Sequence, residues 1–341
     1  MRYEGRGFLP SLSDMILSRF YDWLLELIGL DRKTRAFNAE IDALVQEVSP
    51  SIFNVRGYRK LLRFPMEQAK KHIDGLSETI PGPLPLSAAD WGRGSPAELL
   101  FIDADQVRAL LRASTDLKTF FQNDPAPRAF ALLIATCNEK TIFGSAVEGA
   151  ILRRDVLQEA VDFKDHRIVV PASTQELNCR KIKEGALRLL ALRAMEPLAN
   201  LKSQAEDLSE EKRITEVKLK ILQVQARSLE GLLESDRESE VKADQIRKIL
   251  SEINSELDTV KTELGGPREA LKHLEDSLKN PEEILRYQRL TLRLNWMGVK
   301  VSGEAKDSGK EITLIEVEIN DRLKRVAVLI TVDREEVLNL S

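Results

Sequence analysis

Apolar side chains recur at alternating three- and four-residue intervals over residues 198–233, the longest regular hydrophobic pattern in the chain. Only Lys212 and Thr215 interrupt it. The apolar members are Leu198, Leu201, Ala205, Leu208, Leu219, Leu222, Ala226, Leu229 and Leu233. This spacing keeps one face of a helix apolar, and its persistence over about five heptads predicts a coiled-coil helix.

A second helix with nearly the same pattern is predicted over residues 246–285. Its apolar positions are Ile246, Ile249, Ile253, Leu257, Val260, Leu264, Leu271, Leu274, Leu278 and Leu285. Two successive four-residue steps around Ile253 predict a stutter, which locally unwinds a supercoil. Residues 234–240 contain no apolar side chain, and we place the turn between the helices there, near Asp236.

The two helices should therefore fold back on each other as an antiparallel hairpin. With the turn near Asp236, Leu222 would lie opposite Ile253, and Leu201 opposite Leu274. Pro197 and Pro281 would stand at similar heights and end the arm, because proline kinks a helix or begins a new one.

Gly265-Gly266-Pro267 interrupts the returning helix. Glycine can end one helix and proline can begin the next, so a bend is expected. The sequence leaves open whether this bend is a tolerated kink or a functional hinge.

A β pattern appears on both sides of the hairpin. Before it, an apolar run over residues 129–136, a turn at 138–140 and a return over 141–147 predict two strands. Residues 151–163 predict one or two further strands or a short helix. After the hairpin, alternating segments are predicted as a meander at 290–297, 312–319 and 326–332.

These elements predict an α+β fold, in which an antiparallel β-sheet or sandwich body is interrupted by a long coiled-coil hairpin. Strands flank the hairpin, so the economical arrangement puts both sets in one body. The predicted organisation is an N-terminal helical region (1–80), a linker with short helices (81–128), a first β segment (129–175), a helical hairpin (176–289) with a coiled-coil arm (198–280), and a second β segment with a C-terminal helix (290–341).

Composition agrees with a folded protein that exposes much helix. Apolar residues make up 43% of the 341 residues, charged residues 31% and aromatic residues 5%. The net charge of −4 provides no overall field that would attract nucleic acid or an anionic membrane. No run has transmembrane length, no secretory signal pattern is present, and the two cysteines form no metal motif, so we expect a cytoplasmic, reduced protein.

The most apolar predicted helix covers residues 11–30. Its apolar face contains Leu12, Ile16, Phe20, Trp23, Leu24, Leu27 and Ile28. Its polar face contains Asp14, Arg19, Asp22 and Glu26. An interfacial membrane helix favours basic residues on that face, so this acidic face favours packing against the core or a partner over membrane contact.

One basic cluster lies on a helix predicted over residues 52–76. It consists of Arg56, Arg59, Lys60, Arg63, Lys70 and Lys71. Such a cluster is either a solvated face whose acidic partners lie elsewhere in the fold or a surface that contacts phosphates.

The sequence contains only weak candidates for a metal, catalytic or phosphate-binding motif. Asp103 and Asp105 follow an apolar run, and this pattern predicts either a helix cap or two metal ligands. His166 is predicted in a surface turn. Gly92 and Gly94 resemble half of a phosphate-binding loop but lack a preceding strand and a Gly-Lys-Ser/Thr sequence.

We therefore predict a non-enzymatic interaction subunit of a larger cytosolic assembly, with neither cofactor, metal, membrane span nor small-molecule substrate inferred. Its arm would bind a protein partner or self-associate through a second apolar stripe on the outgoing helix: Ile214, Val217, Ile221 and Val224. Two alternatives remain: a nucleic-acid-associated protein that uses the basic cluster, and an enzyme whose dispersed site leaves no motif.

Overall fold

The computed structural model describes residues 34–89, 91–92, 94–148, 151–229, 236–295, 297–301, 309–320 and 323–338. Side chains are described over the same ranges except 145–154 and 225–240. The chain divides into two compact units. Unit 1 comprises the described part of Met1–Phe64 with Leu198–Lys272, and unit 2 comprises Pro65–Pro197 with His273–Ser341. The helix predicted over residues 11–30 lies outside the described residues.

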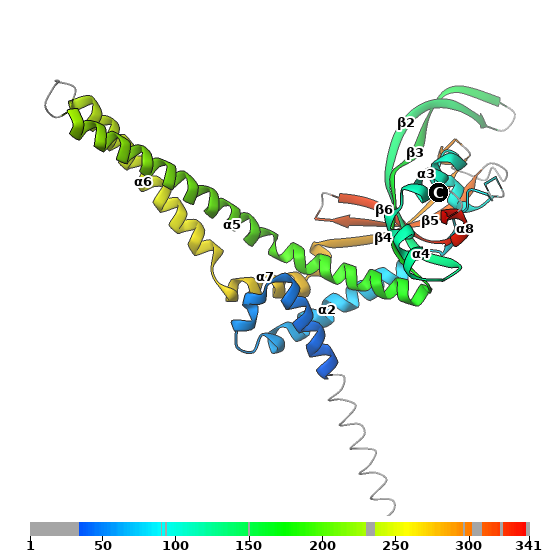
Figure 1. The fold of residues 1–341 in the computed structure, drawn as a ribbon. Helices are drawn as coiled ribbons and strands as arrows, with labels where there is room; N and C mark the ends of the chain where they lie inside the picture. Colours follow the sequence, from blue (N-terminus) through cyan, green and yellow to red (C-terminus); the bar gives the residue numbers. More distant parts are fainter. Residues whose placement is uncertain are drawn as a thin grey trace, which may run out of the picture. The chain divides into compact units, whose positions relative to one another are not determined.

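Unit 2 is built on one curled sheet (Figure 1). Its strands lie in the order β3-β2-β6-β5-β4, and all of these neighbours are antiparallel. Their bounds are β2 Arg128–Glu148, β3 Ile151–Ala172, β4 Leu285–Leu294, β5 Lys310–Ile319 and β6 Leu323–Asp333, while the short β1, Leu84–Pro85, pairs parallel with β6. The strands that precede and follow the helical insertion thus join in one sheet, as predicted.

A short segment links the two edge strands of the curled sheet. Val161 in β3 donates its amide to the Gly298 carbonyl, and the Lys300 amide donates to the Glu159 carbonyl, both at 2.8 Å. On the other side, the Val301 amide donates to the Arg293 carbonyl of β4 at 2.9 Å. Part of each exposed edge is therefore hydrogen-bonded, which leaves less edge to pair with another chain.

The concave face of the sheet surrounds the main core. Alternate residues of the strands point inward, among them Ala131, Leu133, Leu314 and Val328. The filling comes from η2 Pro96–Leu100, α3 Ala104–Ala113, α4 Thr115–Asn123 and α8 Arg334–Leu338. Val107, Leu111, Leu117 and Phe121 are fully buried there, because α3 and α4 each repeat an apolar residue four positions apart.

Other contacts in unit 2 hold helices to strands and to one another. From α2 (Tyr58–Thr79), Nε2 of His72 lies 2.7 Å from the Leu285 carbonyl oxygen. Lys183 of α5 (Gln175–Leu229) pairs with Asp74 at 2.6 Å. Ser277 of α7 (Pro267–Lys279) donates to the Leu190 carbonyl at 2.9 Å.

The predicted turn at residues 138–140 is wrong. β2 runs through it, and Asn138, Glu139 and Lys140 pair with Asp162, Val161 and Ala160 of β3. β3 likewise runs through the surface turn predicted around His166. These polar residues resemble a turn in the sequence because the outer part of the two-stranded ribbon formed by β2 and β3 faces solvent. A strand needs no apolar side chains there.

In unit 1, the described part of α5 and α6 (Asp236–Leu264) pack together (Figure 1). Leu208 of α5 lies in one buried cluster with Ile253, Leu257 and Val260 of α6, and Leu201 and Ala205 pack against it. Leu201 therefore packs near residues 253–260, and the sequence-based pairing of Leu201 with Leu274 is wrong.

The predicted stutter is also wrong. Ile249 is 44% exposed, whereas Leu250 is half-buried. The covered apolar positions of α6 are Ala243, Ile246, Leu250, Ile253, Leu257, Val260 and Leu264. They keep a strict alternation of three and four residues, and so does one row of covered residues on α5: Leu201, Ala205, Leu208, Lys212, Thr215, Leu219 and Leu222.

The ends of the helices differ in part from expectation. α6 begins at Asp236, so the centre of the predicted turn is helical, and residues 230–235 lie outside the described chain. α5 passes through the exposed Pro197, which the sequence placed at a break. The predicted interruption between α6 and α7 is confirmed, and Gly265 adopts a left-handed φ of 59° there.

Candidate functional site

The predicted outer stripe is exposed along α5. The exposed fractions are 44% for Ile214, 47% for Val217, 52% for Ile221 and 63% for Val224. These residues follow one another at helical spacing, and they lie away from Thr215, Leu219 and Leu222, which are covered. The same helix thus has a covered apolar face and an exposed one.

Basic side chains border the outer stripe. On an α-helix, residues 213 and 220 flank one side of the row 214–217–221–224, and residues 211 and 218 flank the other. Arg213, Lys218 and Lys220 are exposed, and the acidic Glu211 is exposed at the near end. Arg213 forms a two-point ion pair with Glu210. Lys218 and Lys220 therefore give the distal half of the stripe a basic border.

The basic cluster of α2 is divided between the two units. Arg56, Arg59, Lys60 and Arg63 belong to unit 1, whereas Lys70 and Lys71 belong to unit 2. The helix begins at Tyr58 after η1 (Pro50–Asn54), later than the helix predicted over 52–76. Arg63 and Lys70 both have interaction partners within the protein.

Arg59 in particular is held by an acid. Its Nε and Nη2 donate to the Asp42 carboxylate at 2.8 and 2.7 Å, and the Tyr58 hydroxyl donates to the same group at 2.6 Å. The hydrogen bond from Arg59 holds the pKa of Asp42 below its usual value, although partial burial opposes the shift. Asp42 thus stays charged and occupies the donors that a phosphate would need.

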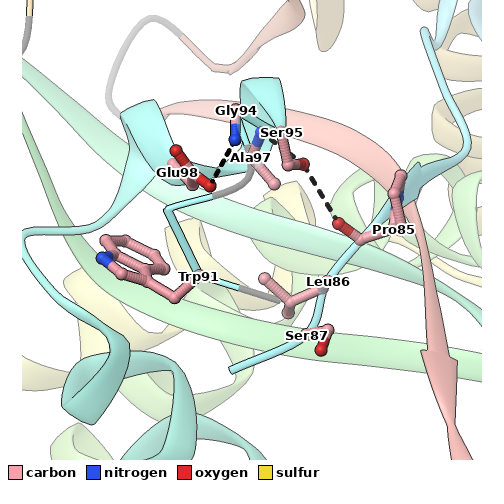
Figure 2. Close-up of a pocket in the computed structure, with 8 residues that line it drawn as sticks. All are labelled: Pro85, Leu86, Ser87, Trp91, Gly94, Ser95, Ala97 and Glu98. Atoms are coloured by element: carbon pink, nitrogen blue, oxygen red, sulfur yellow. Dashed lines mark hydrogen bonds between the residues drawn. The ribbon is translucent and has the colours of Figure 1, made fainter. Parts of the chain in front are cut away.

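A pocket of about 380 Å³ lies in unit 2 between β1 and η2 (Figure 2). Pro85, Leu86 and Trp91 form apolar walls, and Glu98 lies at the other side. Its volume lies near the lower end of the range of small-molecule sites. The sequence did not predict it, although all its lining residues lie within 85–98, because hydrophobic spacing does not show how this loop folds on itself.

Glu98 is the charged group of this pocket. Its Oε1 accepts from the amides of Gly92 and Gly94 at 2.9 and 3.0 Å, and its Oε2 accepts from Lys310 Nζ at 3.0 Å. Burial opposes the charged form, but Lys310 and the two amides outweigh it and hold the pKa of Glu98 below its usual value. The two glycines noted in the sequence therefore hold an internal carboxylate.

Polar side chains around the pocket form hydrogen bonds within the protein. The Ser87 hydroxyl donates to Glu336, and the Ser95 hydroxyl donates to the Pro85 carbonyl at 3.4 Å. Glu98 already accepts three hydrogen bonds, so its carboxylate stabilises the loop.

A second polar group lies where the concave face opens toward the β2–β3 ribbon. Lys300 Nζ lies 2.9 Å from both Glu139 and Glu159, and Glu316 accepts from Gln288 and Lys324 at 2.5 and 2.9 Å. Two lysines thus pair with three glutamates, which leaves one negative charge in excess.

Cys137 is half-buried beside them. Burial, with the nearby Glu139 and Glu316, raises the pKa of its thiol to about 11. At neutral pH the residue is a thiol rather than a nucleophilic thiolate.

Asp103 and His166 have structural roles. Asp103 caps α3 by accepting from the Gln106 amide at 2.9 Å, as the capping interpretation predicts. His166 lies in β3, not in a surface turn, with its ring 4.4 Å from that of Phe101 and Nε2 2.8 Å from the Leu100 carbonyl oxygen. Burial lowers the pKa of His166. Neither residue lines the pocket of Figure 2.

Two kinds of feature are absent from the described residues. Among them, no group of three or more His, Cys, Asp or Glu side chains is arranged to hold a metal ion. Within the same ranges, no helix has the length and apolar character needed to cross a bilayer.

Comparison with known proteins finds no relative, because no family model matches the chain and no curated protein or solved structure is significantly similar to it.

Proposed function

We propose that this protein is an interaction subunit, in which α5 and α6 form an antiparallel coiled-coil arm that presents the outer stripe to a helix of another protein. The observation that carries the proposal is the exposure of Ile214, Val217, Ile221 and Val224, all between 44% and 63%. The covered positions of α5 already pack toward α6, so hairpin formation does not require the stripe.

The coiled coil is supported by the spacing of covered positions. A register that sets Leu208 opposite Leu257 also sets Leu201 opposite Leu264, Thr215 opposite Leu250 and Leu222 opposite Ala243. Each of these residues is buried or half-buried, and the buried cluster contains Leu208 and Leu257. An unbroken three-four alternation on both helices is the pattern of a coiled coil without a stutter.

The stripe supplies a modest binding energy. Full burial of an isoleucine or valine side chain contributes about 1.5–3 kcal/mol, and these four are about half exposed, so covering them contributes about 4 kcal/mol. That energy corresponds to a dissociation constant of about 1 mM. A stable complex therefore needs further contacts, and charged neighbours of the stripe are available to provide specificity.

A partner of different sequence fits better than a second copy packed stripe to stripe. Lys218 and Lys220 border the stripe, so they would meet the same two lysines of a second α5, whether the helices ran parallel or antiparallel. Like charges across an interface oppose association. An amphipathic helix with acidic borders has the complementary charge.

The experiment compares full-length chains that carry an affinity tag in the native host. The variant I214E/I221E places charges on the stripe, and the matched control S251E/S255E places the same charges on exposed positions of α6. We expect a stoichiometric partner to co-purify with the parent and the control but not with the stripe variant, with unchanged helical circular dichroism in all three.

Equal partner recovery from all three proteins would contradict the proposal. Loss of helical signal in the stripe variant would also contradict it, because the stripe would then belong to the internal core of unit 1.

A further inference from the structure

The pocket of Figure 2 has two walls, and the first is formed by the end of β1 and the residues that follow it. The Leu86 amide donates to the Thr331 carbonyl of β6 at 2.9 Å. The amides of Ala88 and Ala89 both donate to the Glu336 carboxylate of α8, at 3.2 and 3.3 Å. Hydrogen bonds to the sheet and to α8 therefore fix the position of this wall.

The second wall is formed by η2 and the loop that leads into it. Lys310 of β5 pairs with the Glu98 carboxylate at 3.0 Å, and the Trp91 side chain packs against the main core. Ala97, in the same wall, is buried. Because contacts within unit 2 hold both walls, the space between them is pre-formed, and a ligand need not order the loop in order to bind.

Polar side chains of the described lining residues are already engaged within the protein. The Ser87 and Ser95 hydroxyls each donate a hydrogen bond, and Glu98 accepts three and is paired with a lysine. A charged ligand would lose its hydration here without gaining an unpaired opposite charge. An uncharged apolar ligand loses little hydration and gains contact with Leu86 and Trp91. The lining therefore favours an uncharged ligand.

The volume of the pocket sets the size of that ligand. A dry cavity of about 150 Å³ holds one benzene molecule. This pocket has about 380 Å³, which is room for a compound with two fused rings. Trp91 has the largest side chain of the lining, and aromatic rings attract one another in offset or edge-to-face arrangements. A flat aromatic compound therefore fits both the space and its largest wall residue.

We propose that this pocket binds an uncharged, planar aromatic compound with two fused rings, which lies against Trp91. The site belongs to unit 2 and does not depend on the outer stripe or on the proposed function. A bare ring system of about ten non-hydrogen atoms, at the efficiency per atom of larger ligands, binds with a dissociation constant on the order of 1 mM.

The test follows the indole N–H signals of the full-length chain by NMR while a probe is added. The probe is quinoline, which has two fused rings and is uncharged at neutral pH. Its matched control is 2-naphthoate, which has two fused rings and a negative charge. The chain contains three tryptophans, and W91L identifies the Trp91 signal. A97L fills the pocket, whereas F143S removes an exposed aromatic ring elsewhere as a control.

We expect quinoline to shift the Trp91 signal saturably, with little change in the other two indole signals. The 2-naphthoate ion should bind roughly ten-fold more weakly, because its carboxylate loses hydration without gaining a partner. A97L should weaken quinoline binding roughly ten-fold, because the leucine side chain occupies the space of the ligand. F143S should bind quinoline as the parent chain does, and circular dichroism should be unchanged in every variant.

A titration that leaves the Trp91 signal in place, or that shifts all three indole signals alike, would overturn the site. Undiminished quinoline binding by a folded A97L chain would overturn it as well, and equal affinity for 2-naphthoate would overturn the uncharged class of ligand. If A97L does not fold, W91L decides by saturation transfer to quinoline. Transfer should then be roughly ten-fold weaker from W91L than from F143S, and equal transfer would contradict the proposal.

Discussion

Replacing Ile253 and Ile249 separately with alanine tests which face of α6 packs against α5. The two residues have the same type, lie about one turn apart on one helix and were both assigned to the coiled-coil seam by their spacing in the sequence. In the structure, Ile253 is 6% exposed within the buried cluster, and Ile249 is 44% exposed.

The expected losses of unfolding free energy differ clearly. Truncation of a buried isoleucine to alanine removes apolar contacts and leaves a cavity, which costs about 3 kcal/mol for I253A. For I249A, about half of the side chain is already in water, and alanine is the better helix former, so the net cost is about 0.5 kcal/mol. The difference of about 2.5 kcal/mol corresponds to nearly two orders of magnitude in the unfolding equilibrium constant.

Native-state hydrogen exchange of α6 amides is the suitable assay, because it reports the opening free energy of this helix even if the two units unfold separately. Circular dichroism verifies equal helical content before the comparison. Equal losses for the two variants, or a larger loss for I249A, would refute the unbroken alternation through Leu250 and restore the stutter.

Three further predictions concern unit 2 and the end of α6. Burial lowers the pKa of His166 in the folded state, so the unfolded state binds the proton more readily. The stability of the folded state should therefore fall as the pH decreases below the unfolded pKa of 6.5. The substitution H166Q should reduce this pH dependence of the unfolding free energy. D103A should lower the free energy of unfolding by about 1 kcal/mol in urea denaturation, and D103N should retain most of it, because asparagine also caps a helix N-terminus. G265A should destabilise the junction between α6 and α7 by about 1–2 kcal/mol, because Gly265 has a φ of 59° and an added Cβ would lie 2.4 Å from the Glu269 side chain. The control G266A places its Cβ in open space and should leave the thermal unfolding temperature nearly unchanged.

The nucleic-acid alternative predicts affinity for duplex or single-stranded DNA that falls steeply with salt. Because Asp42 engages Arg59, and Arg63 and Lys70 have partners within the protein, we expect affinity that is absent or independent of salt in a fluorescence anisotropy titration. A steep salt dependence that is lost in K60E/K71E would support the alternative instead.

The sequence predicts elements with long periodic patterns well. The meander after the hairpin, the helices on either side of Gly265 and the joining of both β segments in one sheet all follow from hydrophobic spacing and flanking residues. Ile249 and Leu250 mark the limit of this reasoning: both are apolar neighbours, and only packing against α5 selects Leu250.

Other features depend on contacts that spacing cannot reveal. Pro197 lies within α5 because loss of one backbone hydrogen bond can be outweighed by packing elsewhere on a long helix. The ion-pair partner of Glu98 at the pocket is Lys310, which is distant in the chain. The outer stripe is the exception, because its four residues share one helix face.

For assembly of the sheet, the whole insertion between Ala172 and Leu285 acts as one closed loop, since β2 pairs with β6 across it. The entropy of closing a loop grows slowly with length, by about 0.6 kcal/mol for each doubling, and helices that return to their starting point lower that cost. Whole heptads could therefore be added to or removed from both helices with little effect on the strands. Under the proposed function, the length of the two helices can therefore change without a change in the strand pairing of the sheet.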